Sequence, residues 1–138
     1  MNKKVLFYTL KYALRSYPLI RPYLGRVDKL FDMSQAELDE YNNEQFVELV
    51  NFAYNKSTFY HNFYDKHGVN IASINGMKDI EKLPVIDKQI VRENIDDIAI
   101  GNRLTLMSAL TGGTTGASLK ILQDYKAVLS EQAYLYKY

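Results

Sequence analysis

The fold class follows from one stretch, Leu104-Thr105-Leu106-Met107-Ser108-Ala109-Leu110-Thr111-Gly112-Gly113-Thr114-Thr115-Gly116-Ala117-Ser118-Leu119-Lys120-Ile121-Leu122. Glycine and hydroxyl residues lie between two short apolar runs, residues 104–108 and 119–122. Short apolar runs bounded by Gly and Ser are typical of β-strands. We therefore expect a β-hairpin with the segment Thr111–Gly116 between its strands.

Upstream of the hairpin the sequence predicts helices. Ser34-Gln35-Ala36-Glu37 has the pattern of a capping box, and apolar residues then recur at helical spacing over roughly 44–55. A second, aromatic helix is expected over Thr58–Lys66, ended by Gly68 in a left-handed conformation. We expect its aromatic residues in the core rather than in a ligand cage. The apolar residues of the two helices are Phe46, Leu49, Val50, Ala53, Phe59, Tyr60, Phe63 and Tyr64.

Three further elements complete the expected α+β fold. A short helix is predicted over Ser73–Pro84, Asp87 is expected to cap a helix over 88–94, and Asp124 to cap a final helix from about 125. The helix from Asp87 is expected to place Ile90 and Val91 on the core side. We predict a helical N-terminal region, a hairpin and a C-terminal helix, divided into a basic region (1–33) and a larger domain (34–138).

The N-terminal region is basic and amphipathic. Residues 1–26 contain no acidic residue, and Pro18 is expected to end the helix that they form. This region could lie on an anionic membrane surface or a partner, or it could pack on the protein's own core. The cations of residues 1–26 are Lys3, Lys4, Lys11, Arg15, Arg21 and Arg26. At helical spacing Lys4, Lys11 and Arg15 share one face, and the opposite face gathers Leu6, Leu10, Ala13, Leu14 and Tyr17.

Composition excludes several classes of function. The 138 residues are 47% hydrophobic and 24% charged, as in a folded protein, and the formal net charge of +1 argues against nucleic acid as a partner. The absence of cysteine excludes disulfides, thiolate metal sites and cysteine nucleophiles. His61 and His67 are expected at the surface rather than on a metal. With no membrane-length apolar run and no cleavage site after the N-terminus, we expect a cytoplasmic location.

The segment Thr111–Gly116 is the candidate binding site. Its glycines allow several backbone N–H groups to point at phosphate oxygens, and its threonine hydroxyls add donors. The Walker A pattern is absent because the chain has no Gly-Lys pair, and the glycine spacing differs from the dinucleotide fingerprint. From the residues alone, phosphate binding and a plain hairpin turn both stay open.

Thr111-Gly112-Gly113-Thr114-Thr115-Gly116 resembles the phosphate loop of adenylate-forming enzymes. Two upstream segments resemble the phenylacetate–CoA ligase branch, and their order is most similar to its CapK-like members of capsular polysaccharide biosynthesis. They are Phe52–Tyr60 and Leu83–Lys88 with the following Val91–Asn94. The chain departs from the pattern at Ser118, where relatives usually have proline, and at Leu119, where many carry lysine. Lys120 follows one residue later and, on a strand, should face the other way.

The resemblance implies ATP-dependent, AMP-forming activation of a small carboxylic acid. ATP with Mg²⁺ would be the cofactor, and coenzyme A or another nucleophile would take the acyl group. Residues Thr111, Gly112, Gly113, Thr114, Thr115 and Gly116 would hold the ATP phosphates. No catalytic residue or resident metal ligand is assigned.

The resemblance also predicts that this chain is an N-terminal fragment. The adenine- and ribose-binding segments and the C-terminal catalytic domain of such ligases have no counterpart here, so we expect an inactive chain that needs a complementing chain or self-associates. The alternative is a non-enzymatic module that binds a membrane or a partner through residues 1–26 and carries a vestigial loop.

Overall fold

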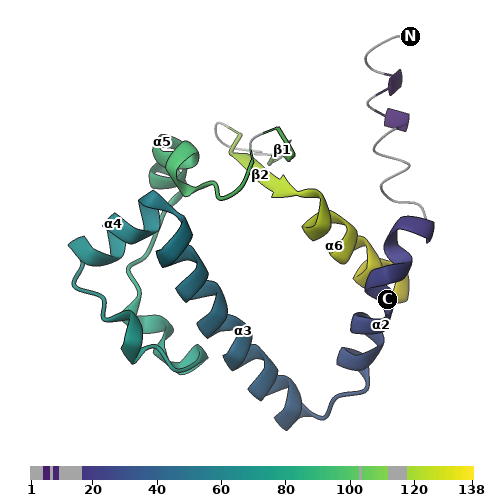
Figure 1. Ribbon diagram of the computed structural model, residues 1–138, viewed down its shortest axis with the longest axis horizontal. Helices are drawn as coiled ribbons and strands as arrows, with labels where there is room; N and C mark the ends of the chain where they lie inside the picture. Colours follow the sequence, from purple (N-terminus) through teal and green to yellow (C-terminus); the bar gives the residue numbers. More distant parts are fainter. Residues whose placement is uncertain (1–4, 7, 10–16, 103, 112–117) are drawn as a thin grey trace. The chain divides into compact units, whose positions relative to one another are not determined.

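The computed structural model describes residues 5–6, 8–9, 17–102, 104–111 and 118–138 (Figure 1). The chain divides into two compact units. The first unit comprises Met1–Met33, Arg103–Met107 and Gln123–Tyr138, and the second comprises Ser34–Asn102 and Ser108–Leu122.

The second unit is built on the long helix α3 (Gln35–Lys56). Its predicted capping box is confirmed: the Ser34 N–H donates to Glu37 Oε2 at 2.8 Å, and the Glu37 N–H donates to Ser34 Oγ at 3.4 Å. Helix α3 is longer than the predicted 44–55 and runs without a break from this cap. Val50 and Ala53 are buried, whereas Leu49 is 63% exposed. Periodicity therefore found the helix but placed one residue on the wrong face.

Helix α4 (Thr58–Lys66) supplies the aromatic core of the second unit. Gly68 follows the helix with φ +66°, which confirms the predicted left-handed end. Tyr64 is buried against Val50 and Ile74, and Phe63 and the other partly buried members surround them. The expectation that the aromatic stripe is core is thus confirmed for Tyr60, Phe63 and Tyr64, whereas Phe59 lies outside this cluster. The partly buried members are Phe46, Tyr54, Tyr60, Phe63, Val69, Ile71 and Leu83.

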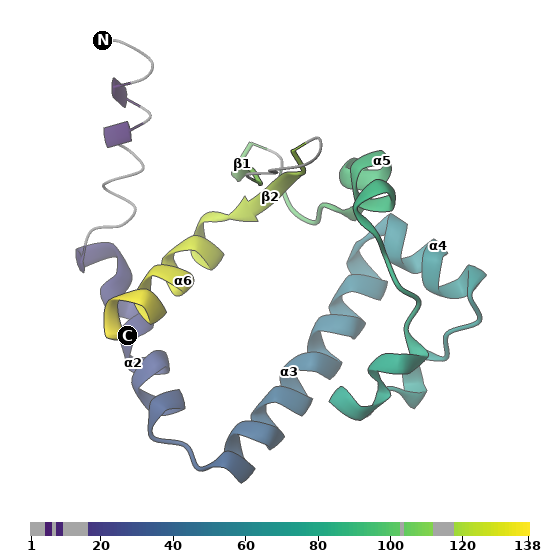
Figure 2. The same ribbon diagram turned by 180° about the vertical axis from the view of Figure 1, so that it is seen from behind.

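The prediction of a single helix over Ser73–Pro84 is wrong. Two short 3₁₀ helices, η1 (Ile71–Ser73) and η2 (Met77–Lys82), replace it. Asn70 caps η1, and the Asp79 carboxylate accepts the Asn75 N–H at 2.7 Å, so local side-chain bonds compete with a continuous α-helix. Figure 2 shows this segment beside α3, which it contacts through both 3₁₀ helices.

Helix α5 (Lys88–Ile98) begins at the predicted cap. Asp87 Oδ1 accepts the Ile90 N–H at 2.8 Å, which confirms the cap. Non-helical angles at Asn94 (φ −119°, ψ 15°) mark a kink where the prediction ended the helix, but the helix continues to Ile98. Ile90 and Val91 are half-buried, and α5 packs on α4.

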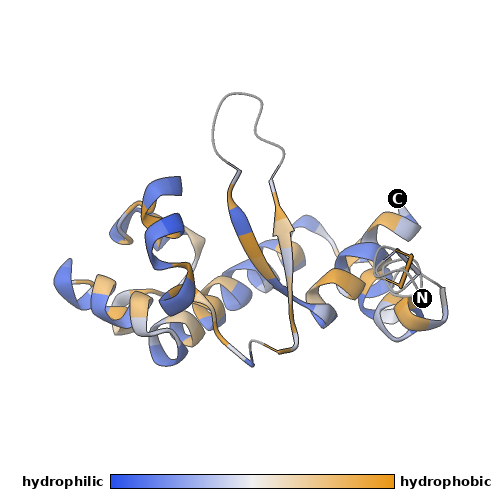
Figure 3. Ribbon diagram, turned by 90° about the horizontal axis from the view of Figure 1, so that it is seen from above, coloured by the Kyte–Doolittle hydropathy of each residue, from blue (hydrophilic) through white to orange (hydrophobic). Residues whose placement is uncertain are grey.

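Strands β1 (Leu106–Leu110) and β2 (Lys120–Asp124) form the two-stranded antiparallel sheet (Figure 3). The first strand lies two residues later than the predicted 104–108. Leu104 and Thr105 form a turn, and the Leu104 side chain is 93% exposed. Pairing with β2, which apolar content does not encode, sets these bounds. The α+β class is confirmed.

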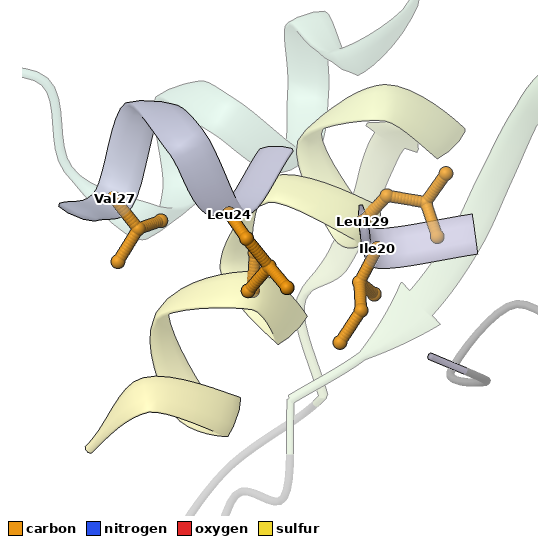
Figure 4. Packing of buried hydrophobic residues seen from close by; sticks show 5 residues of the cluster. Ile20, Leu24, Val27 and Leu129 are labelled. Carbon is orange, nitrogen blue, oxygen red and sulfur yellow. The ribbon is translucent and has the colours of Figure 1, made fainter. Parts of the chain in front are cut away.

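In the first unit, α2 (Tyr17–Phe31) packs on α6 (Tyr125–Lys137). Ile20, Leu24 and Val27 of α2 are buried with Leu129 and Ala133 of α6 (Figure 4). Full burial of one aliphatic side chain stabilises by roughly 1.5–3 kcal/mol, so this cluster holds the two helices together. Asp124 caps α6 as predicted, accepting the Lys126 N–H at 2.6 Å.

Helix α2 corrects the expectation for Pro18. This residue lies in the first turn of α2 instead of ending a helix, because a first-turn N–H has no intrahelical partner to lose. Pro22 also lies inside α2, a helix that the sequence did not predict. The predicted amphipathic faces rest largely on residues 10–16, which lie outside the described residues.

Candidate functional site: the glycine and threonine hairpin

Thr111 and Leu119 pair across the hairpin on either side of residues 112–118. The Thr111 N–H donates to the Leu119 carbonyl at 3.0 Å, and the Leu119 N–H donates to Thr111 Oγ1 at 3.0 Å. One threonine therefore bonds its cross-strand neighbour through both its backbone and its side chain. The reciprocal pair is the last described contact before the candidate segment.

The Thr111 hydroxyl keeps a donor after this bond. A hydroxyl has one O–H donor and two acceptor lone pairs, and the Leu119 N–H occupies one lone pair. The O–H is the group that a phosphate oxygen requires. Thr111 can thus close the hairpin and donate to an anion at the same time.

The other predicted site residues, Gly112, Gly113, Thr114, Thr115 and Gly116, lie outside the described residues. Beyond them, Leu119 is half-buried and Lys120, the first residue of β2, is exposed. Burial does not alternate along β2, because Ile121 is exposed as well, so the predicted facing of Lys120 stays a prediction. Of the predicted site residues, the structure therefore places Thr111.

The two upstream segments that carry the resemblance meet where α4 packs on α5. Ser57 is buried at 3% exposure, and its Oγ donates to the Asp97 carbonyl at 2.8 Å while accepting the Tyr60 N–H at 3.3 Å. The hydroxyl thus satisfies a free N–H at the start of α4 and a free C=O at the end of α5. Sequence reasoning missed Ser57, although a serine directly before a helix is a cap signal.

A small cavity of about 200 Å³ lies beside this junction. Ligand sites typically span roughly 300–1,000 Å³, so this space is too small for a nucleotide. Its lining comes from α4 and α5 and consists of Thr58, Phe59, Asn62, Phe63, Lys66, Asn94 and Asp97.

An open groove of about 870 Å³ along α3 has the wrong charge for phosphate. Four carboxylates line it, and they would repel a polyphosphate rather than attract one. They are Asp39, Glu40, Glu44 and Glu48. Neither hollow competes with the hairpin as a nucleotide site.

Titratable groups with shifted pKa values belong to the framework of the second unit. The pKa of Asp79 is lowered, chiefly by its hydrogen bond from Lys82 (2.8 Å between Nζ and Oδ1) and then by the Asn75 N–H. The hydrogen bond to Asp65 raises the pKa of Tyr54, and burial raises that of Tyr60. These pKa shifts arise from hydrogen bonds and burial around α3, α4 and η2, and none of these groups belongs to the candidate loop.

The two histidines are exposed, as predicted. His61 stacks on Tyr54 with ring centroids 4.4 Å apart, and its Nε2 lies 3.5 Å from Asp65 Oδ2. Within the described part of the chain, His, Asp and Glu side chains form no group of three that could hold a metal ion. Among the same residues, no helix combines the length and apolar character that crossing a bilayer requires.

Comparison with known proteins relates the chain to a protein of Staphylococcus aureus. No protein-family model matches the chain. Over 99 residues, or 72% of this chain, the sequence is 30% identical to Protein CapK of Staphylococcus aureus. The matched region spans 22% of that protein, about a fifth of its length. The chain is therefore related in sequence to Protein CapK.

Proposed function

We propose that this chain is the N-terminal part of an ATP-dependent, AMP-forming ligase that activates a carboxylic acid in capsule or cell-envelope polysaccharide biosynthesis. The observation that carries the proposal is the reciprocal pair between Thr111 and Leu119, which pairs the two flanks of the chain stretch that contains Thr-Gly-Gly-Thr-Thr-Gly. The likeness to Protein CapK supports the capsule-related context.

In the proposed reaction a carboxylate oxygen attacks the α-phosphorus of ATP. The new bond gives an acyl-adenylate, the bond between the α-phosphorus and the bridging oxygen breaks, and pyrophosphate leaves with its electron pair. Coenzyme A or another nucleophile then takes the acyl group and releases AMP. The loop would stabilise the charge on the departing pyrophosphate with amide and hydroxyl donors.

This reaction needs one site for the phosphates of ATP and further sites for adenine, ribose and the acid. Thr111, with Gly112, Gly113, Thr114, Thr115 and Gly116, would bind the β- and γ-phosphates, which carry Mg²⁺ with them. Recognition of adenine, ribose and the acid, and the catalytic lysine, would belong to the whole ligase or to a complementing chain.

Binding of Mg²⁺-tripolyphosphate, measured by calorimetry, tests the loop without requiring a base pocket. We expect the wild-type chain to bind it and Gly113→Val to weaken binding about tenfold or more, because a side chain would block close approach of the phosphates. Gly25→Ala, at a helical position with no atom within 4 Å of the added Cβ, is the control. Equal affinity in Gly113→Val, or no binding by the wild type, would count against the proposal.

The activity itself is tested by exchange of labelled pyrophosphate into ATP. We expect exchange only when the chain is mixed with a chain that supplies the remaining segments, and we expect Gly113→Val to abolish it. Exchange that survives this substitution would remove the loop from the reaction.

A further inference from the structure

We propose that the first unit binds the surface of an anionic lipid membrane through its basic face and its exposed N-terminal apolar residues. Charge separation along the chain is the starting observation. Residues 1–33 contain seven Lys and Arg and two Asp, a formal charge of +5, while residues 34–138 contain ten Lys and Arg and fourteen Asp and Glu, a formal charge of −4. The near-neutral total conceals a cationic first unit: with residues 103–107 and 123–138 included, this unit contains ten Lys and Arg and four Asp and Glu, a formal charge of +6.

Helix α2 leaves its cations outside the core of the first unit. Ile20, Leu24 and Val27 share the face that is buried against α6. Arg21, Arg26 and Lys29 are exposed and lie outside that apolar face. The contact between the two helices therefore leaves the Arg21 guanidinium and the Lys29 ammonium group exposed to solvent.

Apolar side chains are exposed in the same cationic region. Val5, Leu6 and Tyr8 have helical backbone and are 56%, 51% and 66% exposed. Their neighbours in sequence, Lys3, Lys4 and Lys11, are all basic. Exposed apolar side chains in a segment of basic sequence fit the boundary between lipid headgroups and acyl chains, where both kinds of contact are favourable.

The charge identifies the partner. Each Lys or Arg near an anionic lipid surface strengthens binding by about fivefold, and several together suffice for peripheral attachment. Nothing in this inference uses the glycine and threonine loop, so it stands independently of the proposed ligase function.

Co-sedimentation of the full chain with vesicles tests the inference. We expect binding to phosphatidylcholine vesicles that contain phosphatidylserine, little binding to phosphatidylcholine alone, and release at high salt because the attraction is screened. Equal binding to both vesicles, or no binding at low salt, would overturn the inference.

Charge variants locate the surface. Combined Arg21→Gln, Arg26→Gln and Lys29→Gln should lower partitioning by about 100-fold, since each cation contributes about fivefold. The matched control is Lys66→Gln, Lys78→Gln and Lys88→Gln, three exposed lysines of the second unit, which should change it little. Equal losses in both triple variants would overturn the assignment to α2.

Apolar variants separate lipid binding from self-association. Val5→Gln with Leu6→Gln should weaken vesicle binding by at least tenfold. Leu49→Gln with Phe52→Gln, at exposed apolar positions of α3, should not. If the wild type is instead dimeric in lipid-free buffer and the Val5 and Leu6 substitutions make it monomeric, these apolar residues form a contact with a second copy of the chain. That result would overturn the inference.

Discussion

Individual side chains link segments of the second unit that lie far apart in the sequence. The Ser57 hydroxyl bonds the start of α4 and the end of α5, and Asn43 of α3 accepts the Met77 N–H at 2.8 Å to support η2. In each case a side chain, rather than water, makes the hydrogen bond to a backbone group at a helix end that has no partner within its own helix. Such residues fix how the helices of the second unit meet.

Replacing Ser57 with alanine removes both of its bonds. We expect Ser57→Ala to lower the free energy of unfolding by about 1–2 kcal/mol, because a cap is lost and the partly buried Asp97 carbonyl loses its donor. Urea denaturation measures the loss. Ser108→Ala, at an exposed strand position, is the control and should stay within about 0.5 kcal/mol of wild type.

Gly76 is required by the closeness of Asn43 and not by its backbone angles. Its φ of 164° is extended, but an added Cβ would lie 2.6 Å from Asn43 Oδ1 and 2.9 Å from Asn43 Cγ. We expect Gly76→Ala to displace Asn43 and destabilise the protein by about 1–3 kcal/mol. By contrast, Gly25→Ala in α2 meets no atom within 4 Å and should stabilise by about 0.5–1 kcal/mol. Thermal unfolding of both variants checks the opposite signs.

At the scale of secondary-structure elements, Thr111 supports the pairing of β1 with β2. Thr111→Val keeps the β-branched shape but removes the oxygen that accepts the Leu119 N–H. We expect about 1 kcal/mol less protection of the Leu119 amide against hydrogen exchange, while Thr111→Ser, which keeps the hydroxyl, retains most of it. If valine leaves the exchange unchanged, the side-chain bond does not hold the hairpin closed.

At the scale of the whole molecule, acid stability depends on Asp79. Its pKa is lowered in the folded protein, so the unfolded chain takes up the proton at higher pH. The stabilisation is fully present above the ordinary value of 3.8 and is lost as the pH falls through the folded value below it.

Denaturation midpoints measured on either side of this window check the sign. We expect the wild type to lose stability on acidification below 3.8, and Asp79→Asn to be less stable at neutral pH but to lose less on acidification. Glu81→Gln, at an exposed neighbouring position, controls for the change of net charge. An Asp79→Asn variant with the wild-type acid response would remove this carboxylate as the cause.

The sequence alone determined the local ends of elements and the site segment's place in the chain. Ser34, Asp87 and Asp124 cap helices as predicted, and Gly68 ends α4, because each signal acts on backbone groups within a few residues. The strands around the Thr-Gly segment were recognisable for the same reason, although the first ends at Leu110, directly before Thr111, rather than at the predicted Ser108.

Only the tertiary structure decided which faces are buried and how distant segments pair. Leu49 is exposed, although it belongs to the same helically spaced set of apolar residues as the buried Val50. The first strand begins two residues later than its apolar run, and the two short helices η1 and η2 replace one predicted helix. Ser57 and Thr111 acquire their roles from Asp97 and Leu119, partners across the α4–α5 contact and the hairpin. Burial and pairing depend on what another segment offers, and periodicity within one segment does not contain that information.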